Sequence, residues 1–152
     1  MFEILMFLFE NYMDGNVVLK TDNDAVVTEL QRVGFDRYEI DRALDWIEGL
    51  HRFQQSGPPI TSLAIRHYLP MEMEQMGIEG IEFLTHLERL KIVDPLTREI
   101  VIDRVMALDS REVDMGRVKW VILMVLFNQP DKKSALSLLQ DMILADAYDS
   151  LH

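Results

Sequence analysis

The sequence contains no cysteine, which excludes disulfide bonds, thiolate metal ligands and a cysteine nucleophile. Basic residues are scarce as well: 15 Lys and Arg stand against 26 Asp and Glu, and the formal net charge is −11. A surface with this excess of negative charge repels phosphate groups. We therefore expect neither direct binding to nucleic acid nor attachment to an anionic membrane.

The seven glycines stand apart from one another, and the sequence has no glycine-rich loop of the kind that cradles phosphates. It also lacks the Gly-x-Ser-x-Gly motif of serine hydrolases. The four histidines are scattered, without a second histidine or a carboxylate pair at a dedicated metal spacing. These absences predict a protein that is not an enzyme and that uses no metal ion and no cofactor.

Long apolar runs are missing too. The longest extends from Trp120 to Phe127, whereas a membrane-spanning helix needs about 20 residues. The first residues are apolar, but Glu3 and Glu10 interrupt them and no basic segment precedes them, which is unlike a secretory signal peptide. We expect a cytoplasmic protein.

Apolar residues recur at a spacing of three and four along most of the chain, which is typical of amphipathic helices. The segment after Lys119 differs, because it is apolar on every side, and such a helix is normally buried all round. We expect this central helix over residues 115–128, capped by Asp114. The prediction is an all-α bundle of about seven or eight helices packed around it.

Local signals place the other helices. Gly34 is predicted to end one helix in the left-handed conformation, and Asp36 to cap the next, which has Trp46 at the edge of its apolar stripe. Asp94-Pro95 is typical of a helix start. The triplet Ile100-Val101-Ile102 fits either a helix or a strand. The expected helical segments are 1–13, 22–33, 37–55, 71–76, one from about residue 77, one from residue 95, 115–128 and one after residue 130.

We expect a single domain over residues 1–152. The break at Ser56-Gly57-Pro58-Pro59 divides it into two helical halves, 1–55 and 65–152, joined by a loop at 56–64. Either half by itself would bury little apolar surface. The first helix has a wide apolar face, which must meet more than one neighbouring helix or a partner chain. A homo-oligomer through the helix from Met1 to Tyr12 is one expected use of that face.

Two groups of residues are candidates for binding a partner. Gly34-Phe35 resembles the loop of a ubiquitin-associated module, which binds through this loop and the next helix, so we include Phe35 and Trp46. The second group is the polar cluster of Arg98, Glu99 and Asp103. It is either a recognition face or a carboxylate acid/base pair. The alternative is a solvated helix face, or an ion pair to the central helix through Lys119.

Methionine is frequent, with ten residues in the chain, and three lie close together beside two glutamates: Met71, Met73 and Met76. Methionine adapts well to a binding surface, but it is also a common filler of the core. The spacing leaves both interpretations open.

Four blocks of sequence form a distinctive set. They comprise Met1-Phe2-Glu3-Ile4-Leu5-Met6-Phe7-Leu8-Phe9-Glu10; Gly34-Phe35 with Ile40, Ala43-Leu44 and Trp46; Phe83-Leu84 and Leu87-Glu88 with residues 98–104 and Ala107-Leu108-Asp109; and Lys119-Trp120-Val121-Ile122-Leu123-Met124-Val125-Leu126-Phe127-Asn128 with Pro130. With these blocks, which span nearly the whole chain, the sequence resembles the bacterial Smg protein family, also known as DUF494. The resemblance implies no activity, catalytic residue or cofactor. Genes of this family often lie near one for a DNA-processing protein of the natural-transformation pathway, which is an association and not a mechanism.

These observations predict a non-enzymatic interaction protein or adaptor with an acidic helical surface, whose partner is an unidentified protein. The alternative is a regulator linked to DNA processing, which acts through a helix-turn-helix-like or ubiquitin-associated-like N-terminal half. The helix at 37–55 offers Arg37, Arg42 and Arg52 but at least as many carboxylates, which disfavours direct contact with DNA. An enzyme with a carboxylate site at Glu99 and Asp103 is the hypothesis that we favour least.

Overall fold

The computed structural model describes residues 2–12, 23–56, 67–108 and 113–127. These residues form six helices and no strand, which confirms the all-α prediction for this part of the chain. The helices are α1 (Phe2–Tyr12), α2 (Asn23–Val33), α3 (Arg37–Ser56), α4 (Pro70–Arg89), α5 (Pro95–Met106) and α6 (Met115–Phe127). The segments expected at 71–76 and from residue 77 are the two parts of α4, separated by a kink at Gly77. The helix expected after residue 130 lies outside the described residues, as does most of the loop at 56–64.

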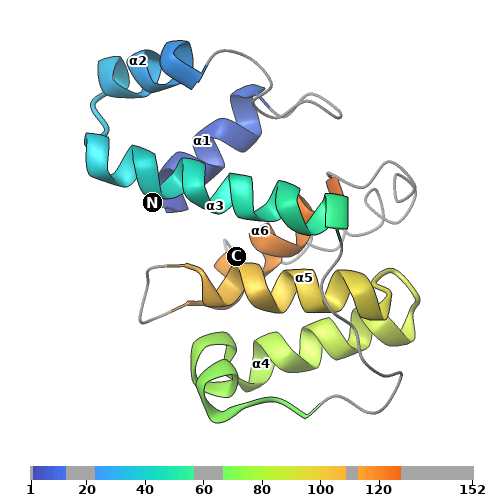
Figure 1. Ribbon diagram of the computed structural model, residues 1–152. Helices are drawn as coiled ribbons and strands as arrows, with labels where there is room; N and C mark the ends of the chain where they lie inside the picture. The colour runs from blue at the N-terminus through green and yellow to red at the C-terminus, as the bar shows by residue number, and fades with distance from the viewer. Residues whose placement is uncertain (1, 13–22, 57–66, 109–112, 128–152) are drawn as a thin grey trace, which may run out of the picture.

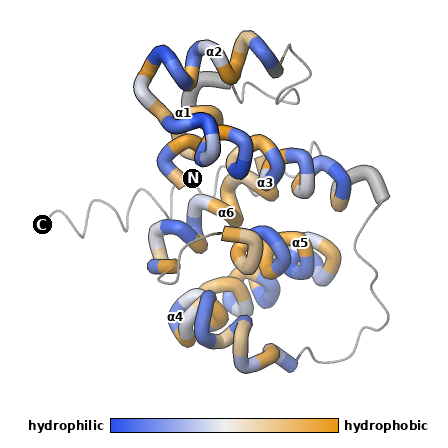
Figure 2. Tube along the Cα trace, turned by 60° about the vertical axis from the view of Figure 1, so that its left-hand side comes forward, coloured by the Kyte–Doolittle hydropathy of each residue, from blue (hydrophilic) through white to orange (hydrophobic). Residues whose placement is uncertain are grey.

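The apolar helix α6 lies inside the fold, as its composition predicts. Residues 121–126 are six consecutive buried positions, each at most 4% exposed. The helix packs against α1, α4 and α5, and Figures 1 and 2 show it between α3 and the layer of α4 and α5. Its start is capped as predicted, because the backbone N–H of Arg117 donates to Asp114 Oδ1 at 2.9 Å.

Helix α5 is the second inner helix, and it contains the ambiguous triplet Ile100-Val101-Ile102. All three side chains are buried, because α5 packs against α3, α4 and α6. The backbone N–H of Thr97 donates to Asp94 Oδ1 at 2.7 Å, and Pro95 occupies the first turn. This cap and the packing on several sides override the strand preference of β-branched residues.

Helix α4 bends at Gly77, whose φ of 72° and ψ of 161° are not helical. The break predicted from sequence at this position is therefore confirmed, and it separates α4 into two helical segments. Glu72 caps the start of α4 by accepting the backbone N–H three residues earlier at 3.1 Å. Gln75 Nε2 donates to the backbone carbonyls of Val105 and Leu108, at 3.2 and 3.1 Å. These bonds hold the first segment of α4 against the end of α5.

The wide apolar face of α1 is used inside the molecule. This helix packs against α3 and α6, and its innermost residues are at most 1% exposed: Ile4, Leu5 and Leu8. The ring of Phe9 meets those of Trp120 and Phe127 edge to face, with centroids 5.3 and 5.2 Å away. The face thus meets more than one neighbouring helix, which is one of its two expected uses. A homo-oligomer through the helix from Met1 to Tyr12 stays a prediction.

The turn between α2 and α3 has the predicted geometry. Gly34 has a φ of 115°, and its N–H donates to Gln31 O at 3.1 Å while Phe35 N–H donates to Leu30 O at 3.1 Å. This pair of bonds is the usual left-handed helix ending. Val33, in the last turn of α2, is half exposed, although its spacing from the buried Leu30 places both on one side of the helix.

The two halves expected from the sequence contact each other through α3 with α5 and through α1 with α6. Helices α2 and α4 lie at opposite ends of this arrangement in both views (Figures 1 and 2). None of the described helices combines the length and the hydropathy that crossing a membrane requires.

Candidate functional site

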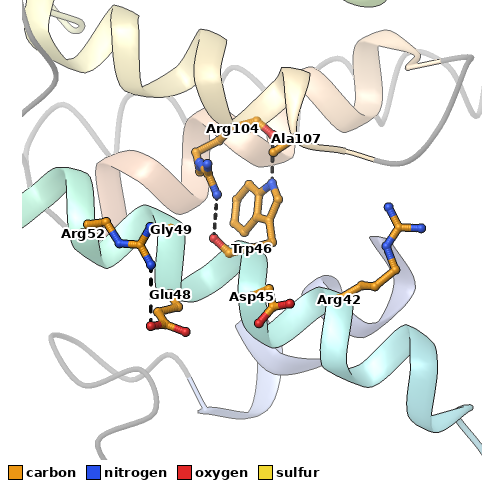
Figure 3. Close-up of a pocket in the computed structure, with 8 residues that line it drawn as sticks. All are labelled: Arg42, Asp45, Trp46, Glu48, Gly49, Arg52, Arg104 and Ala107. Atoms are coloured by element: carbon orange, nitrogen blue, oxygen red, sulfur yellow. Dashed lines mark hydrogen bonds and ion pairs between the residues drawn. The ribbon is translucent and has the colours of Figure 1, made fainter.

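Trp46, predicted at the edge of the apolar stripe of its helix, lies buried at the contact between α3 and α5. Its indole N–H donates to the backbone carbonyl of Arg104 at 2.8 Å. The Nη1 of Arg104 donates in return to the backbone carbonyl of Trp46, also at 2.8 Å. Each side chain therefore binds the backbone of the other residue (Figure 3), and the pair fixes α3 against α5.

The guanidinium of Arg104 is almost fully enclosed. Its Cζ lies 5.6 Å from the ring centroids of both Trp46 and Phe53. Its Nε donates to Asp103 Oδ2 at 2.9 Å, and Nη2 donates to the same oxygen. A buried charge is costly unless it is paired and hydrogen-bonded. Asp103, a candidate recognition residue from the sequence, supplies that pairing here.

Gly49, one turn after Trp46 on α3, makes room for this guanidinium. A Cβ atom at this position would lie 2.4 Å from Arg104 Nη1 and 2.9 Å from its Cζ. Sequence reasoning did not single out Gly49, and it placed Arg104 only in the polar cluster around Asp103, without its contact to Trp46. The available signal was the glycine itself, since glycine inside a helix costs about 1 kcal/mol relative to alanine and often marks a close approach.

A surface pocket of about 400 Å³ lies beside this contact (Figure 3). It is lined by Arg42, Asp45, Trp46, Glu48, Gly49, Arg52, Arg104 and Ala107. The Nη2 of Arg52 lies 3.7 Å from Glu48 Oε1, and the guanidinium of Arg42 lies 5.6 Å from the ring centroid of Tyr38. With Arg104 held by Asp103, the charged groups of the pocket are engaged mainly with the protein itself.

Arg98 joins α5 to α4. Its Nη1 lies 3.0 Å from Glu88 Oε2 on α4, and its Nη2 lies 3.0 Å from Glu99 Oε1. An ion pair thus joins α5 to α4, whereas the pair predicted from α5 to α6 through Lys119 stays a prediction. Lys119, the partner expected on α6, places its Nζ 5.3 Å from the ring centroid of Phe83.

The five residues predicted to bind a partner lie in three separate places. Phe35 packs edge to face on Phe7 of α1, with ring centroids 6.0 Å apart. The other four belong to the two helix contacts described above. The structure therefore does not join the five into one surface, and their role in binding a partner stays a prediction.

A different set of side chains forms the most apolar exposed part of the described chain. Eight large apolar residues are exposed there, and four of them lie within ten positions around the start of α4. We call these four the α4 surface: Leu69, Met71, Met73 and Ile78, which are 49–74% exposed. Met76, by contrast, is buried in the core. The core interpretation is thus confirmed for Met76, while a role of Met71 and Met73 in binding stays a prediction.

In the described part of the chain, no three histidine, aspartate or glutamate side chains are placed to hold a metal ion together. The described part of the chain is therefore all-α. The polar clusters named above connect its helices, while the outer helix α4 and the residue before it leave a group of apolar side chains exposed.

Comparison with known proteins gives the family. The family model described as "Protein of unknown function (DUF494)" matches residues 1–152. The chain is 41% identical over 153 residues to the "Protein Smg homolog" of Nitrosococcus oceani, covering 99% of this chain and 96% of that protein. It is 43% identical over 156 residues to the "Protein Smg homolog" of Shewanella piezotolerans, covering 100% of this chain and 99% of that protein. The chain belongs to the Smg homolog family (DUF494), as its sequence blocks predict. No solved structure matches it.

Proposed function

We propose that this protein is a non-enzymatic interaction module or adaptor, which binds another protein through the α4 surface. The observation that carries the proposal is the exposure of four large apolar side chains within ten residues. Removing such side chains from water is favourable by about 25 cal/mol per Å² of apolar area. Exposed apolar patches of this kind are typical of interaction sites.

The way in which α4 is held supports this role. Leu84 and Leu87 are fully buried in its second segment, and Gln75 bonds the first segment to α5. A surface that is already fixed loses little conformational entropy when a partner binds. Met71 and Met73 add flexible side chains that can adapt to the partner's shape.

The non-enzymatic part of the proposal is supported by the use of the polar clusters. Arg98 and Arg104 each bind a carboxylate next to them in sequence, and each also bonds to a neighbouring helix. These arrangements hold helices together and explain why such charged groups lie where they do.

The alternative of a regulator linked to DNA processing would use α2 and α3. The Nε of Arg37 lies 3.0 Å from Asp41 Oδ1, and Arg52 lies near Glu48. Each of these arginines therefore lies beside a carboxylate, whose negative charge would repel the phosphates of DNA. Direct binding to DNA is therefore unfavourable, and we propose that any link to DNA processing passes through a protein partner.

Affinity capture tests the proposal. The wild-type protein, tagged and returned to cells in which it is native, is expected to retain one partner protein in a stoichiometric amount. The variant with Met71→Ser, Met73→Ser and Ile78→Ser is expected to retain at least about tenfold less, because apolar contacts near the centre of an interface carry most of the affinity. Its thermal unfolding midpoint should stay close to that of the wild type, since these side chains are exposed.

The matched control carries Val33→Ser and Tyr38→Ser, which change exposed apolar residues at the opposite end of the molecule. This control is expected to retain the partner. Loss of the partner from the control but not from the α4 variant would reject the α4 surface and favour the N-terminal half.

A further inference from the structure

The chain around the α4 surface carries charge of one sign. Residues 67–88 include five glutamates and no lysine or arginine. Two of the glutamates have structural roles, because Glu72 caps α4 and Glu88 pairs with Arg98. The other three are exposed: Glu74, Glu79 and Glu82. The ion pairs within the described residues all involve other carboxylates, so these three negative charges face solvent uncompensated.

The exposed glutamates lie next to the exposed apolar residues. Before the bend at Gly77, Glu74 follows Met71 by three positions, and after the bend Glu82 follows Ile78 by four. Positions three or four apart share one side of a helix. On each segment of α4, an apolar side chain and a carboxylate are therefore neighbours on the solvent side. Both segments of α4 therefore present exposed apolar side chains beside exposed carboxylates.

We infer that the occupant of the α4 surface is a basic amphipathic helix of a partner protein. Its apolar side would cover the methionines and Ile78, while lysine or arginine beside that stripe would reach Glu74, Glu79 and Glu82. Amphipathic helices dock by laying their apolar side on an apolar surface, and methionine side chains adapt such a surface to the helix. The inference rests on the proposed function and adds the chemistry of the partner.

A second copy of this chain fits the same surface poorly. Two copies that dock through α4 would bring three exposed glutamates of one copy near three of the other, in a protein whose net charge is −11. Like charges placed opposite one another in an interface are unfavourable. Charge complementarity therefore selects a basic partner over self-association.

Binding of two synthetic helical peptides tests the inference. Both carry leucine at the same positions along one face, and the polar positions are lysine in one peptide and glutamate in the other. Fluorescence anisotropy with the full chain is expected to show the lysine peptide binding at least about tenfold more tightly than the glutamate peptide. The affinity for the lysine peptide should fall as salt is added, because salt screens exposed charges.

Two variants of equal net charge separate a local site from the general acidity of the protein. The first carries Glu74→Gln, Glu79→Gln and Glu82→Gln. The second carries Glu3→Gln, Asp45→Asn and Glu48→Gln, which remove three exposed charges from α1 and α3. We expect the first variant to weaken binding of the lysine peptide about tenfold and the second to change it less than about twofold.

Equal weakening by both variants would overturn the inference, because net charge and not α4 would then attract the peptide. A partner captured through the methionines that still binds the triple glutamine variant would also overturn it, while the proposed function would stand. A partner that is retained after the serine substitutions would instead reject the proposed function. Sedimentation that shows a dimer, lost on Met71→Ser, would assign the surface to a second copy and overturn the inference.

Discussion

Replacing Gly49 by alanine is expected to destabilise the protein, although alanine is the better helix residue by about 1 kcal/mol. The new Cβ would lie 2.4 Å from Arg104 Nη1, so the guanidinium must move. This movement lengthens or breaks the bond from Arg104 to the carbonyl of Trp46 and disturbs its pairing with Asp103. We expect a net loss of about 1–3 kcal/mol in the free energy of unfolding.

The effect of Gly49→Ala on the free energy of unfolding is expected to change sign when Arg104 is absent. Arg104→Ala by itself should cost about 2–3 kcal/mol, because it removes a buried, hydrogen-bonded side chain and takes one donor from the carbonyl of Trp46. Asp103 is 42% exposed, so solvent compensates part of its lost pairing. In this background Gly49→Ala should stabilise the protein by up to about 1 kcal/mol.

Urea unfolding of the four proteins in this double-mutant cycle gives the coupling free energy between positions 49 and 104. A cost of Gly49→Ala that is the same in both backgrounds would contradict the contact between α3 and α5 described above.

The second large effect is expected for Ile122→Ala in α6. Ile122 is completely buried, and truncating such a side chain costs about 2–5 kcal/mol through lost burial and a residual cavity. The matched control is Ile78→Ala on α4, where the side chain is 74% exposed and the change should stay within about 0.5 kcal/mol. Urea unfolding measures both. Since the two substitutions remove the same atoms, similar costs would show that α6 is not the buried helix of the fold.

The parts of the fold that the sequence predicts are those set by neighbouring residues. The caps Asp94 and Asp114, the turn at Gly34 and the buried helix α6 each depend on a few consecutive positions, and each is confirmed. The helical state of Ile100-Val101-Ile102 was open, because a strand and a buried helix share that composition. Packing against three helices decides it.

The contact between Trp46 and Arg104 could not be predicted in the same way, because these residues are 58 positions apart. The ion pair from Arg98 to Glu88 joins two helices across ten positions and the turn between them. Reasoning within a single helix pairs residues one turn apart and misses both contacts. Such reasoning also cannot predict that Met71 is exposed while Met76 is buried, because it does not show which side of α4 meets α5.

The proposed docking of a basic helix on the α4 surface is tested most directly by NMR on protein with isotope-labelled methionine methyl groups. The ten methionines report on separate places in the chain. On titration with the lysine peptide, the methyl resonances of the exposed Met71 and Met73 are expected to shift. The resonances of the buried Met76 and Met124 are expected to stay unchanged. Shifts at other methionines with Met71 and Met73 unchanged would contradict the proposal.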